Sequence, residues 1–347
     1  MVSYPRTHLL LLTAGLSAPL LLAPLAHGAA TTRPAASPEA PGERTFTVTY
    51  TARVTHLPRA AKRVHIWVPL ATTRDGQEVL TRTVRSPVPY TIAQETEYGN
   101  DVLHLTLEAP LPPAVDVVVD YRVTVRGRRV DQDHPSSAVT VEPLARDLQP
   151  DALVVLDDKI RTMAHEATVG YATDLERAKG IYSYVIDFMR YDKTVPGWGR
   201  GDAQRACALA AGNCTDFHSL FIAMARAAGI PARFKIGMTI PHADAGLISG
   251  YHCWAEFHTD ELGWVPVDAS EAWKDPTKRA YYFGTVDPDK LLISVGRDLR
   301  LVPPQQGPPV NLWIAPYVEV DGRPFDGVET QFKFRNSPAT QQEATST

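Results

Sequence analysis

The sequence of 347 residues is short of cysteine, of excess charge and of long apolar runs. Its formal net charge is −4 and no stripe of lysine and arginine gathers anywhere, so the cations that a nucleic-acid partner needs against its phosphates are missing. After residue 30 no segment has the roughly 18 consecutive apolar residues of a membrane-spanning helix. We therefore expect a globular protein of about two domains, with neither nucleic acid nor, after loss of a leader, membrane as partner.

Signatures of metal sites are also missing. No D-x-[DN]-x-[DN]-G loop for calcium is present. Cys207, Cys214, His218 and His252 have side chains of the kinds that bind zinc, but the short spacing of paired zinc cysteines is absent, because Cys207 and Cys214 are seven residues apart. We therefore expect no metal and no other cofactor, with zinc binding as an alternative.

Residues 1–30 have the pattern of a signal peptide. A basic start is followed by an apolar stretch and then by the small residues of AHGAA, while Pro19 and Pro24 disfavour a stable spanning helix. This pattern predicts an exported protein, periplasmic or extracellular, with an uncleaved membrane anchor as the alternative. Residues 31–43 and 336–347 are rich in polar residues, proline or alanine, which predicts a disordered linker and a disordered tail.

The three cysteines are Cys207, Cys214 and Cys253. Thiols of exported proteins meet an oxidising compartment and tend to close into disulfides, and an odd count leaves at least one thiol free in a monomer. A Cys207–Cys253 disulfide would leave Cys214 free, although the spacing does not fix the pairing.

Residues 44–147 alternate between apolar and polar side chains, as in Val115, Val117, Val119 and Tyr121. Alternation with a period of two turns one face of a strand to a core and the other to water. Proline and glycine clusters separate the runs. We expect an antiparallel β-sandwich domain that packs against the rest of the protein or orients a substrate.

From residue 148 the apolar period changes to three and four, which is typical of amphipathic helices. We expect a catalytic α+β domain over 148–335, with Asp174 as an N-cap, and with later apolar runs, including those near Val310 and Tyr317, as strands closing this second domain. The predicted helices are 152–168, 174–190, 203–210 and 214–228, and the predicted strands are 232–240, 250–258 and 262–268.

Cys214 follows a glycine turn and opens a strongly helical pattern. At a helix start, unpaired N–H groups and the helix dipole stabilise a thiolate and can face an oxyanion. A thiol nucleophile also needs a base with an orienting partner. If the strands 250–258 and 262–268 pair with His258 opposite Leu262, His252 lies opposite Asp268 on one face. Neighbouring strand residues face opposite sides, so Cys253 is expected to point away.

The blocks GNCTDFHSLFIAMARAAGIPARF, GYHCWAEF and GWVPVDAS together resemble the transglutaminase-like superfamily. The resemblance implies a papain-like α+β fold, with Cys214 as nucleophile, His252 as general acid/base and Asp268 as its orienter. It implies acyl transfer on amide bonds of a peptide or protein substrate, by hydrolysis or amine transfer. A catalytically silent binding or assembly protein of the same fold is the alternative.

Other side chains near these blocks are further candidates for roles in the site. Trp198, Asn213 and Trp254 are candidates for contacting the substrate or the oxyanion. His218, four residues after Cys214, is expected to pack the helix, and Asp216 suits the dipole at the helix start. Surface positions are expected for the two arginines that flank the helix, Arg226 and Arg233.

Overall fold

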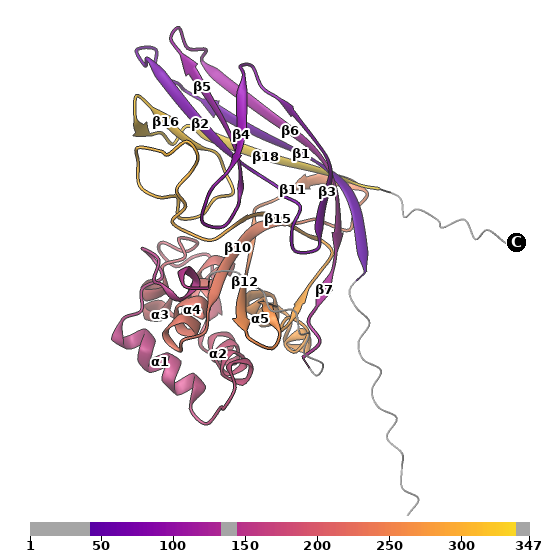
Figure 1. Ribbon diagram of the computed structural model, residues 1–347, viewed down its shortest axis with the longest axis vertical. Coiled ribbons are helices and arrows are strands. Elements are labelled where there is room, and N and C mark those ends of the chain that lie inside the picture. The colour runs from indigo at the N-terminus through magenta and orange to yellow at the C-terminus, as the bar shows by residue number, and fades with distance from the viewer. Residues whose placement is uncertain (1–41, 133–143, 338–347) are drawn as a thin grey trace, which may run out of the picture. The chain divides into compact units, whose positions relative to one another are not determined.

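The computed structural model describes residues 42–132 and 144–337, and its elements are labelled in Figure 1. The expected signal peptide and most of the expected linker and tail lie outside these residues. Glu43 already begins strand β1 and Asn336 ends strand β18, so each of these strands overlaps its neighbouring prediction by one residue. None of the helices in the described residues has the length and apolar character needed to cross a membrane.

Two five-stranded antiparallel sheets form the predicted β-sandwich, and the alternating side chains of both fill one apolar core. The first sheet has the order β11 (Ala245–Ile248), β18 (Val328–Asn336), β1 (Glu43–Thr55), β6 (Ala114–Arg126) and β3 (Gln77–Arg85). The second has the order β17 (Arg323–Pro324), β16 (Tyr317–Val320), β2 (Arg63–Leu70), β5 (Asp101–Glu108) and β4 (Tyr90–Gln94).

The last strands return to this sandwich and do not close the second domain, so their expected placement was wrong. Strand β18 pairs antiparallel with β1, and β16 pairs antiparallel with β2. The side chains of Val318, Phe332 and Phe334 are buried in the sandwich core. An alternating pattern identifies a strand, but it does not say which strand will be its neighbour.

The second half of the fold is a four-stranded antiparallel sheet with helices packed against it, as expected for an α+β domain. Its strand order is β13 (Gly263–Val267), β12 (His252–Thr259), β10 (Ala232–Thr239) and β15 (Lys290–Val295). The α-helices are α1 (Asp158–Thr168), α2 (Asp174–Phe188), α3 (Ala203–Leu209), α4 (Cys214–Ala227) and α5 (Ala269–Lys274). Short elements complete it: β7 (Arg128–Arg129), β8 (Arg190–Tyr191), β9 (Ala211–Gly212), β14 (Thr285–Val286), and the 3-10 turns η1 (Arg146–Leu148) and η2 (Pro276–Lys278).

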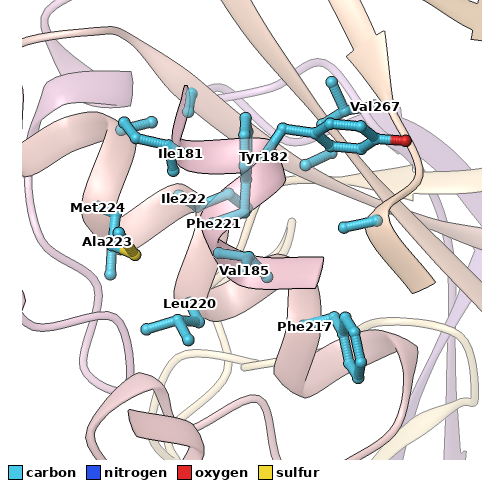
Figure 2. Close-up of a cluster of buried hydrophobic side chains, with 14 of the residues drawn as sticks. Ile181, Tyr182, Val185, Phe217, Leu220, Phe221, Ile222, Ala223, Met224 and Val267 are labelled. Carbon is cyan, nitrogen blue, oxygen red and sulfur yellow. The ribbon is translucent and has the colours of Figure 1, made fainter. Parts of the chain in front are cut away.

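Helix α4 is the central element of this domain. Side chains from every side of it are buried, and Figure 2 shows Phe217, Leu220 and Phe221 beside residues of α2. Such a helix has no solvent face, which explains why its pattern is more apolar than that of a surface helix. Helix α2 has its N-cap at Thr173, one residue before the expected Asp174, with a complete capping box to Glu176.

Strands β10 and β15 join the two halves. They pair in the four-stranded sheet, yet Met238, Leu291 and Ile293 are buried in the core of the sandwich. Strand β10 also carries Phe234 and Ile236 into the core of the helical half. The sandwich therefore shares strands with the sheet on which the candidate site is built.

Candidate active site

Helix α4 begins at Cys214, whose side chain is buried at 2% exposure. Asn213 is the N-cap: its Oδ1 accepts from the Thr215 N–H at 2.9 Å, while Asp216 Oδ2 accepts from the Asn213 N–H at 3.0 Å. This reciprocal capping box fixes the first turn in place. It sets the thiol at the positive end of the helix dipole.

His252 and Asp268 form a close pair. His252 Nε2 lies 2.6 Å from Asp268 Oδ2, and both side chains are buried. Asp268 is the N-cap of α5, and its other oxygen accepts from the Glu271 N–H at 3.0 Å and from the Ser270 hydroxyl at 2.9 Å. The carboxylate is thereby held on both of its oxygens, and the histidine ring is bound to a group that cannot easily turn.

The pairing of β12 with β13 is not the one expected. His258 lies opposite Trp264 and Thr259 opposite Gly263, so the register is shifted by two residues from the prediction. Gly263 closes the turn with a φ of 66°, a conformation that glycine adopts without strain. A shift of two keeps every side chain on its face, and so the contact between His252 and Asp268 is kept although the two are not directly opposed.

The charges around His252 oppose one another. Burial and the nearby Lys290 ammonium disfavour the imidazolium, whereas Asp268 and the hydrogen bond with Cys214 favour it, and the net result raises the pKa of His252 to about 9. Burial would raise the pKa of Asp268, but His252 and Lys290 outweigh it and lower that pKa below its ordinary value. An imidazolium beside a carboxylate is therefore the stable form near neutral pH.

Cys253 does not point away from the site as expected. Its thiol is a hydrogen-bonding neighbour of the Cys214 sulfur and lies 3.4 Å from Thr215 Oγ1 on α4. Cys253, the second residue of β12, therefore lies against the helix that carries Cys214. The hydrogen bond from Cys253, followed by that from His252, lowers the pKa of Cys214 well below its usual value despite burial.

All three cysteines are free thiols, so the suggested Cys207–Cys253 disulfide is not formed. Cys207 lies apart, with its Sγ 3.1 Å from Met163 Sδ between α3 and α1. The alternative zinc set is not assembled in the described residues either, because Cys207 is away from the site and His218 contacts backbone groups through both ring nitrogens. Potential ligand atoms of His252, Asp268 and Glu271 lie within 4.8 Å of one another, but Asp268 is bound to the His252 ring and Glu271 to Lys274, and we assign no metal here.

His218 packs the helix as expected, and its role is specific. Its Nδ1–H donates to the Cys214 carbonyl at 2.7 Å, and its Nε2 accepts from the Ala269 N–H at 3.1 Å. Both nitrogens are satisfied in the neutral ring, and burial lowers the pKa of His218. This histidine therefore ties the start of α4 to the start of α5.

The glycine-rich loop before α3 is held by Asp216, which does more than suit the helix dipole. Its carboxylate accepts from the N–H groups of Gly199 at 2.8 Å and of Gly201 at 3.2 Å. Trp198 in this loop is 40% exposed, beside the Lys193 ammonium. The loop is thereby fastened to the residue that also caps the helix of Cys214.

The other aromatic candidate, Trp254, is only 4% exposed and is stacked on the His252 ring with centroids 6.4 Å apart. It packs on Leu292 and Val295. The Asn213 side chain is engaged as the cap and donates from Nδ2 to the Tyr251 hydroxyl at 3.2 Å. Both side chains are almost wholly shielded from solvent.

Sequence reasoning missed Tyr191 and Lys290. The Tyr191 hydroxyl is a hydrogen-bonding neighbour of the Cys214 backbone, and the centroid of its ring lies 4.3 Å from the Lys274 ammonium. Lys290 Nζ lies 3.6 Å from Asp268 Oδ2. Neither residue belongs to the three sequence blocks, and no motif marks them.

The two arginines expected on the surface are buried. Arg226 donates to the Ala232 carbonyl at 2.9 Å and to Asp151 at 2.8 Å. Arg233 pairs with Glu256, and its guanidinium lies 3.8 Å from the centroid of the Trp264 ring. Buried cations need such partners, which cannot be inferred from the residues that flank each arginine in the sequence.

Residues 161–269 match the model of the transglutaminase-like superfamily core. The chain therefore carries a transglutaminase-like core. This segment contains Cys214, His252 and Asp268. An uncharacterized protein of Haemophilus influenzae is 27% identical over 333 residues, which is 83% of this chain and 89% of that protein. The Bacillus subtilis protein YebA, also described as uncharacterized, is 25% identical over 141 residues, which is 35% of this chain and 19% of YebA.

A likeness in fold extends over most of the chain. A solved structure from Cytophaga hutchinsonii, provisionally described as a cysteine protease, has a TM-score of 0.55 and 15% identity. The likeness covers 85% of this chain and 98% of that protein. At this identity the comparison shows a common fold, helical core and β-domain together, and leaves activity to the site itself.

Proposed function

We propose that this protein is an exported cysteine enzyme that transfers acyl groups from amide bonds of peptides or proteins. The observation that carries the proposal is the clustering of Cys214, His252 and Asp268, three side chains from three elements, in one buried site. A thiol at a helix start, a base beside it and a carboxylate behind the base are the parts that nucleophilic catalysis needs. Export is proposed from the pattern of residues 1–30.

The reaction would begin with the ion pair. The Cys214 thiolate attacks the amide carbonyl, and the negative charge moves to the carbonyl oxygen. The imidazolium of His252 then gives its proton to the departing amine, and an acyl-thioester remains on Cys214. Throughout, Asp268 holds the Nε2 side of the ring, so that Nδ1 is free to serve the sulfur and the amine.

Resolution of the thioester needs a second nucleophile. Neutral His252 takes a proton from water or from a primary amine, which attacks the thioester carbonyl and expels the Cys214 thiolate. Water gives hydrolysis and an amine gives transfer. We propose that the Cys214 N–H at the start of α4 donates a hydrogen bond to the oxyanion. In the structure this N–H contacts the Tyr191 hydroxyl, which the substrate oxygen would replace.

The exposed and buried aromatic candidates take different roles in this proposal. Trp198 is available to a substrate, at 40% exposure on the loop that Asp216 anchors. Trp254 forms the wall behind the His252 ring, and Asn213 acts through the cap.

Selective alkylation tests the proposal. Folded protein is treated with iodoacetamide at about pH 6.5, where an ordinary thiol is almost wholly protonated. Mass mapping is expected to find Cys214 labelled far faster than Cys207 and Cys253, and the advantage lost in His252→Gln. Cys207→Ala, which leaves the site untouched, is the control. Slow labelling of Cys214 in all proteins would favour the silent binding protein.

Substrate turnover gives the second arm. Wild-type protein and Cys214→Ser are incubated with a peptide mixture, with and without added 1,5-diaminopentane. Release of amine or ammonia that requires Cys214 supports the enzyme, and incorporation of the diamine distinguishes transfer from hydrolysis. Selective alkylation without any turnover would leave a reactive thiol but contradict amide chemistry on these substrates.

A further inference from the structure

Strand β15 brings a cation to the back of the site. Lys290 is its first residue and is 7% exposed. The ammonium lies 3.6 Å from Asp268 Oδ2 and donates to Thr239 Oγ1 on β10 at 3.3 Å. Asp268 Oδ2 is the same oxygen that accepts from His252 Nε2 at 2.6 Å. One carboxylate oxygen is thus shared by the histidine ring and a lysine.

We propose that Lys290 is a positioning residue that acts through Asp268 to limit how strongly His252 holds its proton. This inference rests on the proposed function, because it concerns the protonation of the same imidazole. A carboxylate stabilises an imidazolium beside it, and a second cation on the same oxygen weakens that stabilisation and repels the ring's charge. A very basic imidazole would be a poor acid toward a departing amine, so the lysine keeps His252 within the useful range.

Other charged and titratable groups face this site from each element packed around it. They are Cys214 and His218 on α4, Glu271 on α5, Tyr182 on α2, Cys253 on β12, Tyr282 before β14, and Asp287 and Asp289 before β15. Glu271 Oε1 is 3.9 Å from His252 Nδ1 but is itself paired with Lys274 at 2.7 Å. Among these groups, Lys290 is the cation that reaches the Asp268 oxygen bound to the ring.

The sandwich holds this lysine in place. Leu291 and Ile293, the residues on either side of Leu292 in β15, are buried in the sandwich core, while Lys290 itself pairs with Thr239 in the sheet. A lysine side chain is long and flexible in solution, so a fixed ammonium requires a fixed strand. The sandwich supplies none of the three proposed catalytic side chains, but its core anchors the strand that brings a charge to the site.

Direct titration of His252 tests the inference. Wild type, Lys290→Met and Lys290→Arg are labelled with ¹³C-histidine, and the ring signal of His252 is assigned by its loss in His252→Gln. We expect a midpoint near pH 9 in wild type. In Lys290→Met the midpoint is expected to rise by roughly one unit, because a nearby like charge is gone. In Lys290→Arg it stays near the wild-type value.

A merely structural role would give another result. Loss of packing loosens the His252–Asp268 bond, which lowers the midpoint or leaves it unchanged, and either result in Lys290→Met would overturn the inference. Lys290→Gln, which keeps a polar end for Thr239, provides the same comparison if the methionine protein does not fold. Alkylation of Cys214 in the same samples separates the two proposals, since a failed nucleophile would leave the His252 titration, and the effect of Lys290 on it, unchanged.

Discussion

Two buried histidines lie beside the same carboxylate, and their pKa values move in opposite directions. His252, at the start of β12, has its pKa raised to about 9, whereas burial lowers the pKa of His218 on α4. His252 Nε2 is hydrogen-bonded to Asp268 at 2.6 Å, whereas His218 Nε2 lies 3.6 Å from that carboxylate without a hydrogen bond to it. His218 uses its nitrogens on two backbone groups, while His252 keeps one nitrogen for the carboxylate and leaves the other to the thiol.

Burial therefore does not decide the state of a histidine; its partners do. A ring nitrogen that accepts a hydrogen bond from a backbone N–H carries no proton, so His218 is neutral and has a structural role. A ring between a carboxylate and a thiol gains by taking the thiol's proton, so His252 serves as a base. Substitutions of either histidine, or of the groups around them, are expected to remove or enlarge this difference between the two pKa values.

Replacing His252 by glutamine removes the base and has the largest expected effect. We expect the rate of Cys214 alkylation near pH 6.5 to fall about 100-fold, because the thiolate loses its counter-ion and an ordinary thiol with a pKa of about 8.5 is only about 1% ionised there. The rate constant, measured with iodoacetamide from pH 5 to 10, should then follow an ordinary thiol titration. An unchanged low-pH plateau would show that the thiolate does not depend on His252.

Asp268→Asn should remove the contrast between the two histidines. Without the carboxylate, only the hydrogen bond with Cys214 still opposes burial and Lys290 at His252, and its midpoint is expected to fall from about 9 to below the ordinary value near 6.5. Amide turnover is expected to fall by a factor on the order of 100. Asp275→Asn, at the half-buried cap of the 3-10 turn η2, is the matched control. A His252 midpoint that stays near 9 in Asp268→Asn would contradict the assignment of Asp268.

Cys253→Ala tests the second thiol. The hydrogen bond from Cys253 favours the Cys214 thiolate, so its loss should move the acid limb of Cys214 alkylation upward by roughly one unit. The alkaline limb, which reports His252, should stay in place. Cys207→Ala is the control. A shift of the acid limb as large in Cys207→Ala as in Cys253→Ala would show that repacking of the core, and not the lost hydrogen bond, causes the shift.

His218→Gln should leave chemistry almost untouched and lower stability. We expect Cys214 alkylation within about threefold of wild type, with the free energy of unfolding reduced by about 1–3 kcal/mol as the Cys214 carbonyl and Ala269 N–H lose a partner. Urea unfolding measures the second quantity. A loss of reactivity as large as in His252→Gln would erase the distinction between the two rings.

The pH dependence of stability follows from His252 in the same way. Its folded pKa is raised, so its contribution to folding is complete below the unfolded value of about 6.5 and is lost as pH rises through about 9. Urea midpoints of wild type should therefore decline between those values relative to His252→Gln. A constant difference between the two proteins over that range would contradict the raised pKa.

The sequence predicted the helices and strands better than it predicted which elements pack or pair with one another. Helix α4, strand β12 and the meeting of His252 with Asp268 followed from local patterns, because a period of 3.6 or 2 and a face of a strand are local properties. These local patterns did not predict the turn before Gly263, so the predicted register of β12 against β13 was wrong by two residues. A shift of two still leaves each side chain on the predicted face of the sheet.

What the sequence missed is contact between distant segments. Strand β18 returns to β1 across nearly the whole chain, and Lys290 approaches Asp268 from another strand. Cys253 was assigned to the wrong side because its orientation depends on where α4 packs, which alternation within β12 does not specify. Each of these errors arises because packing between distant elements is not encoded in the local sequence pattern.

Ultraviolet absorbance of the thiolate itself examines the Cys214–His252 ion pair without a probe. The difference spectrum of wild type minus Cys214→Ser is recorded as the pH rises from about 4 to 10. We expect a thiolate signal already present near pH 6, far below the ordinary thiol pKa of about 8.5. A signal that appears only above about pH 8 would rule out the ion pair and the mechanism built on it.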